Sequence, residues 1–390
     1  MRLISIKDIK KGMVLGKSIY NPNGTLLLGA GFRINIDIIA KLNARGYTHV
    51  YIIEEGTEDV IPEDVISEEM RLRAKMKLTD NVELVKNAMN FKYLTLEKAS
   101  DLMESGYLEK VNISFELRKL VKDILEEISA TGAKFMSTIM IKSRDTYFLD
   151  HSINTTVLAI LIGAKYRFST PELTSLALGS LLHDIGKIVI EQIQQTSSWK
   201  TSTNLYREHP TFGYLLLKNS PEITPMELQI VNQHHEFQDG SGFPIGLKGQ
   251  NLPPVKTEKS RLNGYIFRLA EITCIANAFD NLLLNPLEEK KLTPQEALGQ
   301  LILNAGTHYN KDIIETLHQI VPFFPVGTQI KIVDIVDPNL MGCYGVVAKI
   351  NEEAFNRPVI IITTNKKRKK IKPIMLDTSR LNRIELKLII

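Results

Sequence analysis

Hydrophobic and polar positions change their spacing along the chain, and the changes divide it into four parts. In residues 1–65, short apolar runs alternate with turns. Two strands are predicted around the turn NPNG in SIYNPNGTLLLGAGFRI, followed by a short helix at IDIIAKLNARGY and a strand at THVYII. Residues 54–64 are acidic, contain Pro62 and are typical of a linker. The first part is therefore predicted to be a small α+β module.

Residues 66–134 have the spacing of helices. In FELRKLVKDILEEIS, apolar side chains recur at steps of three and four residues, at Leu117, Leu120, Val121 and Ile124. Such a stripe covers one face of a helix and has to be buried against another surface. We interpret this part as a helical connector, and the stripe motivates the hypothesis of a homodimer that forms through it.

Helical spacing continues through residues 135–325, and strand patterns return in residues 326–390. The C-terminal part contains three predicted strands, TQIKIVDIV, GVVAKI and PVIIITT. The sequence therefore predicts a mainly α protein with a small N-terminal α+β module and a short β-rich C-terminal segment. The basic run KKRKK at 366–370 falls between two strands, where a solvated loop is favoured over a membrane or anion site.

Composition limits the partners and the location of the protein. A chain of 390 residues suggests two or three domains, and its net charge of +4 is small for that length. No DNA or RNA partner is therefore expected, whereas a phosphate-bearing small molecule is compatible with this charge. Two cysteines provide no disulfide framework, and the N-terminus lacks the apolar stretch of a secretory signal. The run VLAILIGA is far shorter than the ~20 residues of a membrane span, so a cytoplasmic protein without a span is predicted.

The candidate chemistry lies in one helical region that contains five of the eight histidines. These are His151, His183, His209, His234 and His235. Neutral imidazole is a common ligand of transition metals, so the clustering points to a metal site. His183 is followed by Asp184 in LLHDIGK, where an apolar run predicts burial. A buried carboxylate needs a positive partner, and a pair of metal ions bridged by Asp184 supplies one. Lys187 is then available for a phosphate oxygen or a leaving group, although a surface lysine at a helix end is the alternative.

The stretch HHEFQDGSGFP follows a helical pattern that has to end there. Gly240, Gly242 and Pro244 extend a helix poorly, so a loop is predicted directly after the two adjacent histidines. This loop can lie over a ligand, and a plain turn is the alternative. Its candidate substrate-binding residues are Asp239, Gly240, Gly242, Phe243 and Pro244.

The order of these motifs resembles that of a known family. The motifs are DHS at His151, HDIGK at His183, EHP at His209, and HHEFQDGSGFP at His234. Over residues 135–325 the chain resembles the HD-GYP family of bacterial cyclic di-GMP phosphodiesterases, a subgroup of the HD-domain metal-dependent phosphohydrolases. The resemblance implies a catalytic domain built as an HD-type helical bundle. Residues 1–65 resemble a small regulatory module often found ahead of such domains.

Further implications of the resemblance concern the metals and the reaction. It implies two divalent ions, iron or manganese, activating a water that attacks phosphorus and opens cyclic di-GMP to pGpG and, in some members, to GMP. Asp184 would bridge the ions, with His151 and His183 on one ion and His209, His234 and His235 on the other. Asp184 and Lys187 would be the catalytic residues. Tyr147 occupies the position where some relatives carry a glutamate for a third metal, so two ions are expected.

Several positions depart from the family pattern. Phe243 replaces the usual tyrosine, and Asn277 replaces an aspartate that is a metal ligand in the family, with Asp280 as a substitute three residues later. The segment LLNPLEEKK carries no arginine where the family has a short Arg/Lys motif for phosphates. An apparent insertion, KTEKSRLNGYIF, begins at residue 256. These departures leave two alternatives open: a cyclic di-GMP receptor or interaction protein without useful turnover, with protein signalling partners, and an HD phosphohydrolase for another nucleotide.

Overall fold

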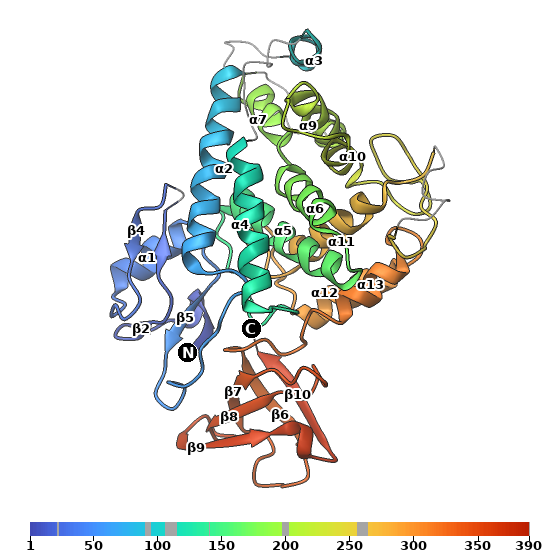
Figure 1. Ribbon diagram of the computed structural model, residues 1–390. Coiled ribbons are helices and arrows are strands. Elements are labelled where there is room, and N and C mark those ends of the chain that lie inside the picture. Colours follow the sequence, from blue (N-terminus) through green and yellow to red (C-terminus); the bar gives the residue numbers. More distant parts are fainter. Residues whose placement is uncertain are drawn as a thin grey trace.

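The structure is a computed structural model that describes residues 1–21, 23–89, 95–105, 115–139, 141–196, 203–255 and 264–389. Helices form the body of the molecule, with the N-terminal module beside helix α2 and the C-terminal sheet at the opposite end from α3 (Figure 1). The protein is therefore mainly α with a small N-terminal α+β module and a β-rich C-terminal segment, as the sequence predicts. Residues 256–263 of the apparent insertion lie outside the described residues.

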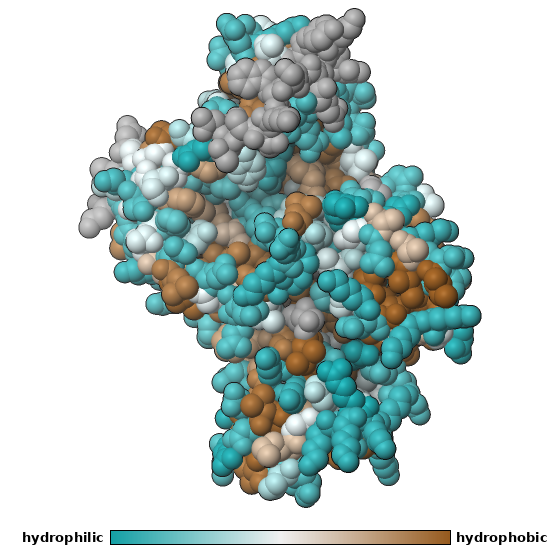
Figure 2. Space-filling view, turned by 180° about the vertical axis from the view of Figure 1, so that it is seen from behind, coloured by the Kyte–Doolittle hydropathy of each residue, from teal (hydrophilic) through white to brown (hydrophobic). Residues whose placement is uncertain are grey.

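The N-terminal module consists of two small sheets and one helix. Strands β1 (Arg2–Ser5), β5 (His49–Ile53) and β2 (Val14–Leu15) form an antiparallel sheet in the order β1-β5-β2. Strands β3 (Ile19–Tyr20) and β4 (Leu26–Leu28) form the predicted hairpin, whose turn contains Pro22, outside the described residues. Helix α1 (Ile36–Ala44) begins at Asn35, whose side chain accepts a hydrogen bond from the Ile38 amide. Figure 2 shows a hydrophobic area over this module, which exposes Leu26, Phe32 and Ile36.

The predicted connector contains helices α2 (Glu68–Ala88), α3 (Leu96–Glu104) and α4 (Phe115–Thr131). The apolar stripe of α4 is at most 3% exposed at Leu117, Leu120, Val121 and Ile124, and it belongs to the same hydrophobic core as the helices that follow. The stripe therefore packs within one chain. This corrects the reasoning behind the predicted homodimer, because the stripe is not available to a second subunit.

The remaining helices build the central bundle. They are α5 (Tyr147–Lys165), α6 (Thr170–Leu182), α7 (Lys187–Thr196), α8 (Thr203–Tyr206), α9 (His209–Leu217), α10 (Pro225–Gln233), α11 (Arg268–Leu282), α12 (Pro294–Leu303) and α13 (Lys311–His318). Three of them, α6, α10 and α12, carry proline in the first turn and a glutamate that accepts a hydrogen bond from the N-cap backbone. Two of these helices, α6 and α10, lead at their other ends to His183 and His234.

One stretch of the bundle, Thr170–Gln194, is long and apolar enough to cross a membrane. Its most apolar window is 89% buried inside the protein, and the stretch includes His183 and Asp184. Burial in the core of the bundle accounts for its hydropathy.

The C-terminal segment is a five-stranded antiparallel sheet. Its strands are β6 (Gln329–Ile335), β7 (Tyr344–Lys349), β8 (Val359–Thr364), β9 (Lys370–Asp377) and β10 (Ile384–Ile389), in the order β10-β6-β7-β8-β9. The three predicted strands correspond to β6, β7 and β8. The basic run 366–370 is exposed at the turn before β9, where Arg368 lies over the Tyr344 ring and Lys370 pairs with Glu55 at 2.8 Å.

The burial of the α4 stripe generates a stability prediction. Replacing Leu120 with alanine should lower the free energy of unfolding by about 2–4 kcal/mol, because it leaves a cavity in the core. Denaturant unfolding at two protein concentrations measures this loss, and the midpoint should not depend on concentration. The exposed neighbour Lys122→Ala is the control and should stay within about 0.5 kcal/mol of the unmodified chain. A loss seen only at high protein concentration would place the stripe in an interface between subunits.

Candidate metal centre

The five predicted histidines converge on Asp184 in the centre of the bundle. His183 and Asp184 follow the end of α6, His209 begins α9, and His234 and His235 follow the end of α10. His151 lies in the second turn of α5, four residues after the helix begins. Asp184 and four of the histidines are at most 1% exposed, and His235 is half-buried. Helix ends that are far apart in sequence thus bring their polar side chains to one buried point.

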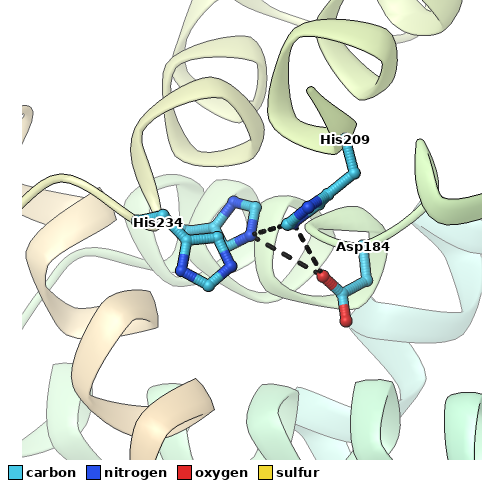
Figure 3. Close-up of side chains that lie close together, drawn as sticks. Asp184, His209 and His234 are labelled. Atoms are coloured by element: carbon cyan, nitrogen blue, oxygen red, sulfur yellow. Dashed lines mark hydrogen bonds and ion pairs between the residues drawn. The ribbon is translucent and has the colours of Figure 1, made fainter. Parts of the chain in front are cut away.

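Asp184 lies between two groups of ligand atoms. Its Oδ1 is 3.2 Å from Nε2 of His209 and 3.7 Å from Nε2 of His234, and Figure 3 shows these three side chains facing one another. Its Oδ2 is 3.4 Å from Nε2 of His183 and 3.6 Å from Nε2 of His151. The ligand atoms of Asp184, His209, His234 and His235 lie within 4.8 Å of one another, as do those of His151, His183 and Asp184. This is the division into two sites that the family resemblance implies.

The histidine rings are held with one nitrogen toward this point. Nδ1 of His183, His209 and His234 contacts a backbone carbonyl three residues earlier, at 2.7 to 2.8 Å. A carbonyl only accepts, so Nδ1 carries the proton and Nε2 presents a lone pair. Nε2 atoms of His209 and His234 lie 3.1 Å apart, where two lone pairs repel unless a cation lies between them.

Several buried polar atoms at the centre have no hydrogen-bond partner among the residues that the structure describes. They are Nε2 of His151, His183 and His235 and Oδ1 of Asp184. Unsatisfied buried nitrogen and oxygen atoms are costly, and those that converge with lone pairs inward are the donor set of a metal site. The residues present therefore fit divalent metal ions.

Burial and charge also set the protonation states that metal ligands need. Burial lowers the pKa of His234 to about 3 and holds the pKa of His235 well below its usual value, so both rings are neutral near pH 7. Burial alone would raise the pKa of Asp184, but His183 and the Lys187 ammonium hold it well below its usual range. His234 and His235 are thus neutral imidazoles and Asp184 is an ionised carboxylate, which are the metal-binding forms.

Lys187 is directed toward the centre from the first turn of α7. Its ammonium donates to Oδ2 of Asp184 and lies 5.3 Å from the centroid of the Tyr206 ring. The side chain is 24% exposed, so one part of it reaches solvent. The alternative of a surface lysine at a helix end therefore does not describe this side chain.

Asp280 occupies a different place from the one predicted for a substitute ligand. Its Oδ2 lies 2.7 Å from Nδ1 of His151 and 3.2 Å from Nζ of Lys142, and its Oδ1 accepts from the Asn154 amide at 3.0 Å. Both oxygens are engaged by these neighbours, and Asp280 is not among the grouped ligand atoms of the described residues. We therefore interpret Asp280 as a residue that orients the His151 ring, since a carboxylate on the far nitrogen fixes the tautomer of a ligating histidine.

Asn277 is buried one turn before Asn281. Its Oδ1 accepts a hydrogen bond from the Asn281 side chain at 2.6 Å, and Asn281 accepts in turn from the Tyr147 hydroxyl. Tyr147 stacks on His151, with ring centroids 5.6 Å apart. Asn277 thus belongs to a polar chain beside His151, and its amide oxygen already has one donor.

Helix α2 contacts the same turn of α5 that carries His151. Arg71 donates to Oδ1 of Asn154 at 2.8 Å, and Lys75 pairs with Asp150 at 2.6 Å. Arg71 and Lys75 are one helical turn apart and so are Asp150 and Asn154, so the two contacts form parallel rungs. Sequence reasoning missed these partners because charged residues on α2 carry no local sign of what they face. One signal was available in the sequence: Asn154 lies three residues after His151, which places both side chains on the same face of a helix.

The loop after the histidine pair is held close to the centre. Glu236 accepts hydrogen bonds from the amides of Ile245 at 2.7 Å and Leu247 at 2.8 Å. The Phe243 ring stacks on His235, with centroids 4.5 Å apart and planes at 14°. At Gly242 a Cβ atom would lie 2.4 Å from the backbone nitrogen of Phe237, so only glycine fits.

The other candidate residues of this loop have different surroundings. Asp239 is exposed, and its carboxylate accepts from the backbone and hydroxyl of Ser241, which lower its pKa. Gly240 adopts φ +85° beside Lys248, and Pro244 is half-buried. The structure thus brings Phe243 to His235, a predicted metal ligand, whereas Asp239 and Gly240 form the turn.

Several known proteins are similar to this chain. Residues 136–313 match the HD domain family, which confirms the resemblance drawn from the motifs. The chain is 24% identical over 217 residues to a cyclic di-GMP phosphodiesterase of Pseudomonas aeruginosa, covering 54% of this chain and 49% of the relative. It is 25% identical over 273 residues to a cyclic di-GMP phosphodiesterase of Thermotoga maritima, covering 67% of this chain and 65% of the relative.

Two further similarities concern another substrate and a solved structure. The chain is 23% identical over 215 residues to a 3'3'-cGAMP-specific phosphodiesterase of Vibrio cholerae, covering 54% of this chain and 38% of the relative. An HDG"Y"P protein from Bdellovibrio bacteriovorus is 17% identical with a TM-score of 0.40, covering 82% of this chain and 98% of that one. The chain spans less than two thirds of the length of each of the three curated relatives.

The contact between Asp280 and His151 generates a prediction on metal affinity. Asp280→Asn should weaken binding of one of two metal ions by about 10- to 100-fold, because the ring loses its orienting carboxylate. Titration of the metal-free protein, followed calorimetrically, measures both affinities. Thermal unfolding of the metal-free variant separates this effect from lost stability, since Lys142 also loses its partner. The exposed Asp337→Asn is the control, and equal affinities in both variants would contradict the assignment.

The buried histidines make the stability of the metal-free protein depend on pH. In the unfolded chain a histidine has a pKa of about 6.5, whereas burial lowers the pKa of His234 to about 3. As the pH falls below about 6.5, the unfolded chain binds protons that the folded chain does not, so stability present above this pH is lost. Glu271 acts in the opposite sense, because burial raises its pKa to about 7, but it is one group against several histidines.

Denaturant unfolding at pH 7.5, 6.5 and 5.5 checks this pH dependence. The free energy of unfolding should decrease toward pH 5.5, and His234→Gln should reduce the slope by up to about 1.4 kcal/mol per pH unit. His318→Gln, at an exposed position of α13, is the matched control. A slope that is the same in all three proteins would show that His234 is protonated equally in both states.

Proposed function

We propose that this protein is a metal-dependent phosphodiesterase that opens cyclic di-GMP to pGpG, with GMP as a further product. The observation that carries the proposal is the buried Asp184 carboxylate with one oxygen facing each of two histidine groups. Two-ion sites of this kind catalyse hydrolysis of phosphate esters. The curated relatives named as cyclic di-GMP phosphodiesterases support the substrate.

In this proposal, His151 and His183 hold one divalent ion, and His209, His234 and His235 hold the other. Asp184 serves both. Asn277 completes the first set as a ligand, and Asp280 supports that set by orienting the His151 ring. When bound, two such ions supply a water nucleophile at neutral pH and neutralise charge on the phosphate. A set rich in imidazole favours transition metals over magnesium or calcium, in keeping with iron or manganese.

Lys187 and the loop contribute from the protein side. The Lys187 ammonium reaches the centre, where it pairs with Asp184, and a phosphate oxygen placed there accepts a charge-assisted hydrogen bond from it. Phe243, held against His235 by stacking, and its neighbours Gly242 and Pro244 cover one side of the centre. Burial of the ligands excludes water, which strengthens each of these electrostatic contacts.

A receptor without useful turnover is the second candidate function. The observation that favours it is Asn277, which is neutral and accepts a hydrogen bond from Asn281 where the family has a ligating aspartate. A third candidate is an HD phosphohydrolase for another nucleotide, which the relative named for 3'3'-cGAMP brings into consideration.

We further propose that the protein acts in the cytoplasm, with residues 1–65 as a regulatory module, 135–325 as the catalytic domain and 326–390 as an accessory sheet. Residues 66–134 take part in the catalytic core as well as connecting it to the module, because α2 and α4 share its hydrophobic cluster. Protein signalling partners belong to this proposal; DNA and RNA do not.

The test is turnover of cyclic di-GMP by anaerobically prepared protein loaded with iron or manganese, with bound metal quantified in the same sample. Asp184→Asn should lower kcat by at least about 10³-fold and reduce metal content, because it removes the negative charge shared by both sites. Asp337→Asn, exposed in the turn after β6, should match the unmodified chain.

The variant Asn277→Asp separates the candidates. Formation of pGpG by the unmodified chain supports the phosphodiesterase. Full metal occupancy and tight cyclic di-GMP binding with no product, in both the unmodified chain and Asn277→Asp, would overturn it in favour of the receptor. Product from another cyclic dinucleotide only would overturn the substrate assignment.

A further inference from the structure

Arg207 lies beside the metal centre, two residues before His209. Its guanidinium carbon is 4.7 Å from the centroid of the Phe243 ring, and its Nη2 donates to the Gly242 carbonyl at 3.4 Å. The same Phe243 ring stacks on His235. Arg207 is therefore linked to a predicted metal ligand through one aromatic ring, and its guanidinium plane is held by that ring.

Unlike Lys187 and Lys142, Arg207 has no carboxylate partner in the described part of the chain. Lys187 is paired with Asp184, and Lys142 is paired with Asp280. Among the residues that the structure describes, no carboxylate forms an ion pair with Arg207, and its side chain is exposed. A guanidinium without a counter-charge, at the edge of a phosphate-binding centre, is suited to a second anionic group.

Lys291, one of the two lysines of the segment after α11, does not supply this charge. Its ammonium donates to the backbone carbonyls of Asn285 and Glu288 in its own loop. Burial, with the nearby Lys291 charge as a second cause, lowers the pKa of His49 in the N-terminal module to about 4. Lys291 thus does not supply the charge of the family's Arg/Lys motif.

We propose that Arg207 binds the second phosphate of a cyclic dinucleotide whose first phosphate lies at the metal centre. This inference rests on the proposed function. A cyclic dinucleotide carries two phosphates, and the planar fork of a guanidinium binds a phosphate through two parallel hydrogen bonds. The contact with Phe243 holds the fork in place, and the N–H groups other than the one on Gly242 remain for a phosphate, which lowers the entropy lost on binding.

The surface between the two cations suits a nucleotide. Tyr206 lies between Lys187 and Phe243: its ring centroid is 5.3 Å from the Lys187 ammonium and 6.5 Å from the Phe243 centroid. Two cations joined by an aromatic surface match two phosphates joined by a nucleoside. Arg207 thereby replaces the missing basic motif, although it lies before His209 in the sequence and the motif would follow Leu282.

The experiment compares two substrates in the metal-loaded full chain. Arg207→Ala should raise KM for cyclic di-GMP by about tenfold, from loss of a charge-assisted contact, with kcat changed by less than about twofold. Hydrolysis of bis(p-nitrophenyl) phosphate, which has one phosphate, and the bound metal content should be unchanged. Arg207→Lys should be intermediate, because it keeps the charge and loses the fork. Arg368→Ala is the matched control, since Arg368 also stacks on an aromatic ring but lies in the C-terminal sheet.

The outcomes separate this inference from the proposed function. Turnover by the unmodified chain with an unaltered KM in Arg207→Ala would overturn the inference and leave the phosphodiesterase intact. An equal loss on both substrates, with loss of metal, would overturn it in favour of a structural role. If the unmodified chain binds cyclic di-GMP without product, the same tenfold change is expected in Kd and its absence overturns the inference. No binding and no turnover in the unmodified chain would overturn both.

Discussion

The arrangement of the bundle depends on one buried carboxylate. Asp184 is 1% exposed and ionised, and an isolated charge in such a place would be strongly unfavourable. Four imidazole nitrogens and one ammonium surround it at short range, so the ends of α6, α7, α9 and α10 and the second turn of α5 have to meet at this point. Three features help to bring these segments together. They are the helix starts with proline and glutamate, the short turn between α6 and α7, and Gly242.

The histidine rings around Asp184 are themselves held in place by hydrogen bonds to their Nδ1 atoms. Three histidines use the carbonyl of their own preceding turn as a partner for Nδ1, which requires only local helical geometry. His151 differs because its partner is Asp280 of α11, itself balanced by Lys142 and Asn154. One of the two histidine groups is therefore built from contacts local in sequence, and the other depends on the packing of α5, α11 and α2.

This difference explains which parts of the fold and of the site can be predicted from the sequence. The predicted hairpin, α1, the strand at 49–53 and three C-terminal strands follow from alternation and turn residues, and the structure has them. The histidine cluster was also recognisable, because each residue stands in a short motif next to a helix end. Asp280 was assigned as a substitute ligand because spacing along α11 does not reveal that Lys142 and Asn154 occupy its oxygens. The stripe on α4 showed that a face is buried, but not that α6 of the same chain covers it. Arg207 was missed because a lone arginine has no pattern.

The shared core of α2 and α4 with the bundle has a consequence for what counts as a unit of this protein. The HD family match begins at residue 136, after both helices have ended. A fragment cut at that boundary would keep every predicted metal ligand and expose the surface that Leu117, Val121 and Leu78 now cover. The segment that matches the HD family, residues 136–313, is thus smaller than the segment that shares one hydrophobic core. Insertions and truncations in such chains are better placed before Glu68, where the chain leaves the N-terminal module, than at the edge of the motif.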